Sequence, residues 1–179
     1  MYSCFVRRYP HSGNLGFRRD LKRSLKQRSV KMSWDTQQQR RLGLEKDVLQ
    51  NKLRNVSWFN PTSKGNTRVE WRVNTNNGNS YTLRVYIPSN FPNECPTLVV
   101  SSPSSPLRKK DGSLLNSTSG ADHTYGAYDG LTQICHFDKD KWMSENTIYQ
   151  VLMKGRIWLE AYEIHWRTGE NLEKYLAHM

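Results

Sequence analysis

The chain has 179 residues, of which 36% are apolar and 11% aromatic, enough apolar side chains for one hydrophobic core. No apolar run approaches the roughly 18 residues that a membrane-spanning helix needs, so we expect a soluble protein without a membrane span. The three cysteines, Cys4, Cys95 and Cys135, argue against a disulfide framework and for a reducing compartment, the cytoplasm or the nucleus.

A basic segment, residues 1–32, precedes the domain that we expect over residues 33–179. Nine Lys or Arg and one Asp lie within residues 1–31, so most of the net charge of +11 belongs there. This composition is typical of a solvated, disordered extension, and it also fits an organellar presequence, which is rich in Arg and Ser and poor in acids. Nucleic-acid binding is expected at most as a property of this tail, which lacks interleaved aromatic residues and a base-reading motif.

An amphipathic helix is predicted from Thr36 to about Leu53, because Leu42, Leu49 and Leu53 share one stripe. Thr36 and Gln39 have the spacing of a capping box.

Four strands are predicted after this helix, at residues 56–59, 68–73, 81–87 and 98–100. In the third strand Leu83, Val85 and Ile87 alternate with polar residues, which indicates one buried face. The Asn77-Gly78 pair before it is a strong hairpin signal. A helix followed by a four-stranded antiparallel meander predicts an α+β fold.

A long exposed loop is expected over residues 101–130, because residues 101–121 are dominated by Ser, Pro, Gly and charge. The final segment has a clear helical stripe that includes Ile148, Leu159 and Trp166. Ser144 is a candidate N-cap, and Gly155 can divide the run into two helices. Residues 170–176 then form a short terminal helix.

The third strand leads into a connection that prolines hold in an extended path. The residues that define this motif are Tyr81, Pro88, Phe91, Pro92 and Pro96. At this spacing the motif resembles the strand and Pro-rich turn of ubiquitin-conjugating enzymes (the UBC-like superfamily). Cys95 stands where that family favours an apolar residue, so we expect it to pack in the core.

The region around Cys135 extends this resemblance. In the family the nucleophilic cysteine follows a Gly and precedes a Trp and a Thr-Ile, and here Gly130, Cys135, Trp142 and Thr147-Ile148 stand in that order. The usual His-Pro-Asn before the cysteine is missing, and two of the spacings differ. A closer resemblance is to divergent bacterial conjugating-enzyme-like proteins, whose pattern matches His123, Tyr125, Asp129 and Gly130 and the stretch at residues 158–169.

This resemblance implies a UBC-like fold with an N-terminal helix, a four-stranded antiparallel meander and C-terminal helices. It implies a transferase that carries a ubiquitin-like modifier as a thioester on Cys135 and passes it to an amine or thiol. The partners would be a ubiquitin-like protein, its activating enzyme and a ligase, and no cofactor is implied. The alternative is a catalytically inactive adaptor that binds ubiquitin-like proteins or their ligases, because the His-Pro-Asn is absent.

Two histidines are candidate catalytic residues beside Cys135. His123 or His136 could promote ionisation of the thiol, orient an acceptor amine or donate to an oxyanion. Each has a structural alternative, because His123 ends a polar loop and His136 points away from Cys135 if the segment is extended. Asp129 is interpreted as a turn residue, and Tyr125 either shapes the pocket or packs. No paired ligand spacing indicates a metal site.

Overall fold

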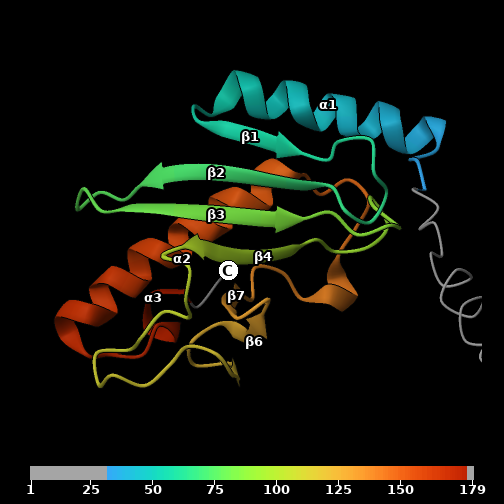
Figure 1. The fold of residues 1–179 in the computed structure, drawn as a ribbon. Coiled ribbons are helices and arrows are strands. Elements are labelled where there is room, and N and C mark those ends of the chain that lie inside the picture. The colour runs from blue at the N-terminus through green and yellow to red at the C-terminus, as the bar shows by residue number, and fades with distance from the viewer. Residues whose placement is uncertain (1–31, 177–179) are drawn as a thin grey trace, which may run out of the picture. The chain divides into compact units, whose positions relative to one another are not determined.

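The computed structural model describes residues 32–176, within which the strands form a seven-stranded antiparallel sheet (Figure 1). In chain order the elements are α1 (Thr36–Lys52), β1 (Val56–Phe59), β2 (Arg68–Asn74), β3 (Ser80–Tyr86), β4 (Thr97–Ser102), β5 (Thr118–Ser119), β6 (Thr124–Tyr128), β7 (Leu131–Ile134), η1 (Lys139–Lys141), α2 (Ile148–Thr168) and α3 (Glu173–Leu176). The predictions for residues 1–31, a disordered extension or a presequence, lie outside the described residues.

The predicted fold, a UBC-like arrangement on a four-stranded meander, is wrong. The first helix and the four expected strands are present as α1 and β1 to β4. The strand order is β1-β2-β3-β4-β7-β6-β5, so the sheet continues through three more strands beyond β4. Strands β5 and β6 lie within residues 101–130, where we expected a long loop. The sequence pattern did not reveal β5 or β7. Strand β5 has only two residues, and β7 is buried at all four positions and so lacks the alternation of a half-buried strand.

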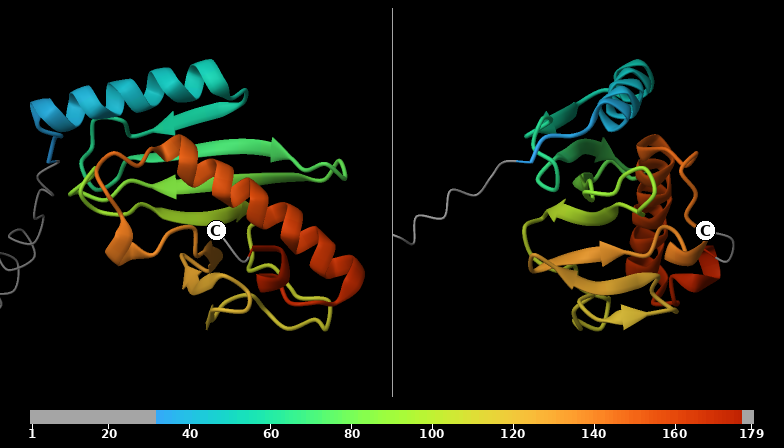
Figure 2. Two further views of the ribbon diagram at one scale, coloured as in Figure 1. Left: turned by 180° about the vertical axis from the view of Figure 1, so that it is seen from behind. Right: turned by 90° about the vertical axis from the view of Figure 1, so that its right-hand side faces the viewer.

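Helix α2 covers one face of the sheet, as Figure 2 shows, and Gly155 lies against that face. A Cβ atom at this position would lie 2.8 Å from a methyl carbon of Leu83 on β3 and 2.8 Å from one of Leu98 on β4. Gly155 therefore permits close packing of helix on sheet and does not divide the helix, which is continuous from Ile148 to Thr168.

The two long helices, α1 and α2, begin at N-caps other than the expected residues. Asp35 caps α1, and its side chain accepts from the backbone N–H of Gln38. Thr147, three residues after the predicted Ser144, caps α2 and forms a capping box with Gln150. Each cap satisfies backbone donors of a first turn and so defines where the helix begins.

The hydrophobic core lies between the sheet and α2, with α1 at the β1 side. Its fully buried large side chains come from every layer of the fold: Trp158, Phe91, Leu49, Leu83, Ile87, Leu98, Leu115, Ile134, Ile148, Leu152, Leu159 and Leu172. Ile134, the residue before Cys135, is thus part of this core.

The Pro-rich connection between β3 and β4 is a packed structural element. Phe91 is fully buried, its carbonyl oxygen accepts from Gln38 Nε2 at 2.8 Å, and the Arg41 guanidinium lies 5.5 Å from its ring centre. The Pro92 carbonyl accepts from Trp142 Nε1 at 2.7 Å. These contacts join the connection to α1 and to the segment before α2, so the motif residues Phe91, Pro92 and Trp142 act in packing.

A two-residue turn joins β6 to β7 and directs the chain toward Cys135. Asp129 and Gly130 both have positive φ, 52° and 71°, the conformation that a tight hairpin turn requires. Asp129 also accepts from the hydroxyl of Tyr86 on β3 at 2.8 Å. The interpretation of Asp129 as a turn residue is confirmed.

Candidate active site at Cys135

Cys135 follows β7 directly and is half-buried. Its backbone N–H donates to the His123 carbonyl at 2.8 Å, which extends the β6–β7 ladder by one residue beyond the Thr124–Ile134 pair. The main chain at the cysteine is therefore held by the sheet, while the side chain stands at the point where the strand ends. This arrangement presents a partly exposed thiol on a rigid support.

Tyr125 lies on β6, which pairs with the strand that leads to Cys135. Thr124 pairs with Ile134 and Gly126 pairs with Gln133, so Tyr125 is the extra residue of a β-bulge. Its hydroxyl donates to the Phe137 carbonyl at 2.8 Å. Burial raises the pKa of Tyr125, so the phenol keeps its proton at neutral pH.

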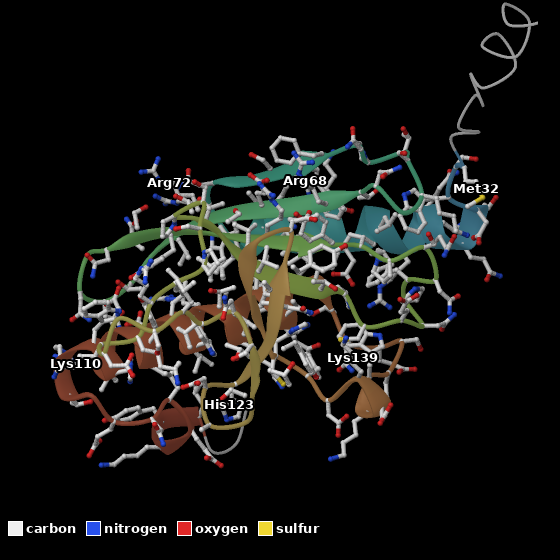
Figure 3. All side chains as sticks on the ribbon, turned by 60° about the horizontal axis from the view of Figure 1, so that its bottom comes forward. Met32, Arg68, Arg72, Lys110, His123 and Lys139 are labelled. Atoms are coloured by element: carbon white, nitrogen blue, oxygen red, sulfur yellow. The ribbon has the colours of Figure 1, made fainter. Side chains whose placement is uncertain are left out.

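Two lysines place positive charge over the aromatic rings near Cys135. The Lys139 Nζ lies 4.7 Å from the ring centre of Tyr125, and the Lys154 Nζ lies 3.8 Å from the ring centre of Phe137. Burial lowers the pKa of Lys154, whereas the thiolate forms of Cys135 and Cys95 would raise it. Figure 3 shows His123 and Lys139 on the side from which the β6–β7 hairpin projects.

His123 meets Cys135 through the backbone. Its carbonyl accepts the Cys135 N–H, and its φ of 50° is the left-handed conformation that lets the chain turn into β6. Within residues 32–176 its ring makes no hydrogen bond. The structure thus brings His123 next to Cys135 without pairing the imidazole with the thiol.

His136 faces the other cysteine. Its ring is buried, with Nδ1 3.2 Å from the Ile134 carbonyl and Nε2 3.7 Å from Cys95 Sγ. Because a carbonyl only accepts, Nδ1 carries the proton and Nε2 is free to accept from the Cys95 thiol. Burial lowers the pKa of His136 to about 4, so the imidazole is neutral at pH 7. The residue after Cys135 is therefore a poor base for it.

Cys95 is half-buried, which agrees only in part with the expected core position. Burial raises the pKa of Cys95 to about 11, with Lys139 and Lys154 acting in the opposite direction. At neutral pH Cys95 is thus a protonated thiol, with the Pro96 carbonyl and His136 Nε2 each 3.7 Å from its sulfur, and not a nucleophile.

The arrangement can support nucleophilic chemistry at sulfur. A thiol attacks as the thiolate, and a nearby hydroxyl and ammonium groups stabilise the negative charge that forms on it or on a carbonyl oxygen. Of the residues at this site, Lys139 and Lys154 were missed from the sequence. Lys154 lies on α2, 19 positions after Cys135, and only the packing of α2 on the sheet brings the two regions together.

A metal centre finds no ligand set here. Among residues 32–176, no group of three or more His, Cys, Asp or Glu side chains is placed to hold an ion. Within the same residues, no helix combines the length and the apolar character that crossing a bilayer demands.

Comparisons with known proteins give no assignment. A scan against protein-family models and a search of curated proteins both found no match for this chain.

Proposed function

We propose that the protein carries a ubiquitin-like modifier as a thioester on Cys135 and transfers it to an amine or thiol acceptor. The observation that carries this proposal is a half-buried free cysteine at a strand end, with the ammonium groups of Lys139 and Lys154 over the neighbouring rings of Tyr125 and Phe137. The motif residues from Tyr81 to Pro96 and the order of residues around Cys135 resemble those of ubiquitin-conjugating enzymes and add support. The proposal depends on these residues and not on the arrangement of the sheet.

The reaction is an exchange between two thioesters. The Cys135 sulfur attacks the carbonyl carbon of the modifier, which is bound as a thioester to its activating enzyme. A bond forms between that carbon and the Cys135 sulfur, the bond to the activating enzyme's sulfur breaks, and the proton of Cys135 ends on the released thiol. An acceptor amine then attacks the new thioester, and the thiol of Cys135 is restored as the amide forms.

The partners of this proposal are the ubiquitin-like protein, its activating enzyme and a ligase. The compartment that fits is the cytoplasm or the nucleus, because Cys95 and Cys135 are both free thiols.

A non-catalytic adaptor is the second candidate. The observation that favours it is that, within residues 32–176, neither the His123 ring nor the His136 ring hydrogen-bonds the Cys135 sulfur, and the His136 ring pairs with Cys95. Such a protein would bind ubiquitin-like proteins or their ligases without forming a covalent intermediate.

The test is formation of a covalent adduct. The protein is incubated with ATP, activating enzymes and their ubiquitin-like proteins, and adducts are resolved with and without reductant. We expect a reductant-sensitive adduct with one such pair, loss of it in Cys135→Ala, and a reductant-resistant ester in Cys135→Ser.

Cys95→Ala is the matched control, and it should retain the adduct. An adduct that survives in Cys135→Ala but disappears in Cys95→Ala would reject Cys135 as the carrier. Binding of a ubiquitin-like protein without any adduct, across the cognate pairs, would favour the adaptor.

A further inference from the structure

A polar cavity lies on the face of the sheet that α2 does not cover. Buried positions on β2 alternate with Arg68, Glu70 and Arg72, which therefore point away from the core, and Figure 3 shows Arg68 and Arg72 along this strand. The cavity has a volume of about 420 Å³, and no residue of the Cys135 site lines it. Its wall includes the charged side chains of Arg68 and Asp129, the rings of Tyr86 and Tyr128, and the amides of Asn60 and Asn66.

The guanidinium group of Arg68 is held in place without a hydrogen bond. Its central carbon lies 4.6 Å from the ring centre of Phe59, the residue that it faces across β1 and β2. Its Nε lies 3.4 Å from Glu70 Oε1 but has no hydrogen-bond partner within residues 32–176. That same Glu70 oxygen accepts from Arg84 Nε at 2.7 Å. Two guanidinium groups thus share one carboxylate, which leaves one positive charge at the cavity without a counter-charge.

Asp129 supplies the opposite charge on the same wall. Its Oδ2 accepts from the Tyr86 hydroxyl at 2.8 Å, and its Oδ1 makes no hydrogen bond with the part of the chain that the structure describes. The carboxylate also takes part in none of the salt bridges within residues 32–176. The cavity therefore presents a positive and a negative group, each with capacity for a further partner.

We propose that this cavity binds a free α-amino acid, with the ligand's carboxylate on the Arg68 guanidinium and its ammonium group on Asp129. Charge complementarity favours a zwitterion, because a simple anion would be attracted by Arg68 and repelled by Asp129. A guanidinium that is already oriented by stacking on Phe59 suits a carboxylate, which it can hold through two parallel hydrogen bonds.

The wall of the cavity also indicates the kind of side chain that the ligand carries. The Tyr86 and Tyr128 rings lie 4.9 Å apart, and Tyr128 is 40% exposed, so an aromatic surface is open to the ligand. The volume falls within the range of about 300–1,000 Å³ that is usual for small-molecule sites. An aromatic amino acid such as phenylalanine fits both features. This binding function is separate from thioester transfer and does not depend on Cys135.

The test is a titration of the full-length, ¹⁵N-labelled protein with L-phenylalanine, followed by NMR. We expect the backbone amide signals of Gly65, Asn66 and Asp129 to shift in a saturable way. Two related ligands separate the contacts: phenylalanine amide lacks the carboxylate, and N-acetyl-phenylalanine lacks the ammonium group. Each should bind about 10-fold more weakly than L-phenylalanine, the effect of losing one charge-assisted hydrogen-bonded pair.

Variants assign each contact to its residue. Arg68→Gln should weaken binding of L-phenylalanine about 10-fold and leave the weaker binding of phenylalanine amide unchanged. Asp129→Asn should weaken L-phenylalanine to a similar extent and leave N-acetyl-phenylalanine unchanged. Asparagine tolerates the positive φ of residue 129 and still accepts from Tyr86, so the turn is kept. Arg72→Gln is the matched control, because Arg72 lies on the same strand and face but outside the cavity.

Three results would overturn the proposal. The first is the absence of saturable shifts at these amides up to the solubility limit of L-phenylalanine. The second is equal affinity for L-phenylalanine and its two derivatives, which would mean that neither charged group is recognised. The third is that inorganic phosphate displaces L-phenylalanine while Asp129→Asn has no effect, which would define a site for anions alone. The ¹⁵N spectrum of each variant without ligand reports whether its fold is intact, so that weaker binding is assigned to the lost contact.

Discussion

Two tyrosines, Tyr81 on β3 and Tyr125 on β6, contact polar partners in very different ways. Tyr81 lies beside Glu163, whose carboxylate accepts from Thr75 Oγ1 at 2.7 Å and from the side-chain amides of Asn77 and Asn79. Tyr125 donates its hydroxyl to the carbonyl of Phe137, two residues after Cys135, at 2.8 Å. We call the first group the Glu163 cluster and the second the Cys135 site.

The two groups differ in how fully their charged side chains are paired. In the Glu163 cluster both carboxylate oxygens have donors, and these bonds, opposed by burial, lower the pKa of Glu163. A satisfied buried carboxylate holds the β2–β3 hairpin to α2 and leaves nothing for chemistry. At the Cys135 site, Lys139 and Lys154 are absent from the salt bridges formed within residues 32–176. Positive charge there remains available to an incoming anion.

The largest expected effect is the loss of folding stability in acid that follows from the buried ring of His136. Its pKa lies at about 4 when folded, against 6.5 when exposed, so the unfolded chain takes up the proton first as pH falls. Stability is then lost between about pH 6.5 and pH 4, by up to about 3 kcal/mol. Urea unfolding of the native protein and of His136→Asn across this range measures the contribution, and the variant should show a flatter dependence above pH 5.

His123→Asn is the control for that measurement, because the His123 ring is only half-buried. If both variants retained the steep loss of stability between pH 6.5 and 5, protonation of buried His136 would not be its cause.

The second effect concerns the Glu163 cluster. Glu163→Gln replaces an acceptor oxygen by a donor that faces the amide donors of Asn77 and Asn79, and we expect a loss of about 2 kcal/mol in the free energy of unfolding at pH 7. Because the pKa of Glu163 is lowered, the native protein loses this contribution as pH falls below the ordinary carboxyl range, and the variant should not.

Alkylation of Cys135 provides the cross-check between the two regions. Its rate should be the same in Glu163→Gln as in the native protein. A change of several-fold would mean that the two regions are coupled through α2, and the comparison would fail.

The smallest effect is electrostatic. Lys154→Gln removes one positive charge near Cys135, and we expect alkylation at pH 7 to slow about threefold, corresponding to about 0.6 kcal/mol. The difference should shrink in high salt because mobile ions screen a partly exposed charge. Lys46→Gln, an exposed position on α1, controls for net charge. Equal slowing in both variants would assign the effect to overall charge and not to the site.

Local patterns predicted the regular elements well. The leucine stripe before residue 53 became α1, the alternation at Leu83 and Val85 became β3, and the Asp129-Gly130 pair formed the expected turn. These features depend on neighbours in the chain, since capping, periodicity and positive φ are local properties. Strands β5 to β7 were missed because their pairing joins segments whose own patterns are weak, and β4 finds its partner β7 more than 30 residues away.

The sequence by itself determined that Cys135 would stand between a turn and the final helix, because the spacing of Gly130, Cys135 and Ile148 is a property of the chain. Only the tertiary structure decided which side chains surround the sulfur. It turned His136 toward Cys95, placed Tyr125 at a bulge with its hydroxyl on the Phe137 carbonyl, and set Lys154 over Phe137. Side-chain direction at a strand end depends on register, bulges and the packing of a distant helix, and these arise only when the non-local contacts of the folded chain form together.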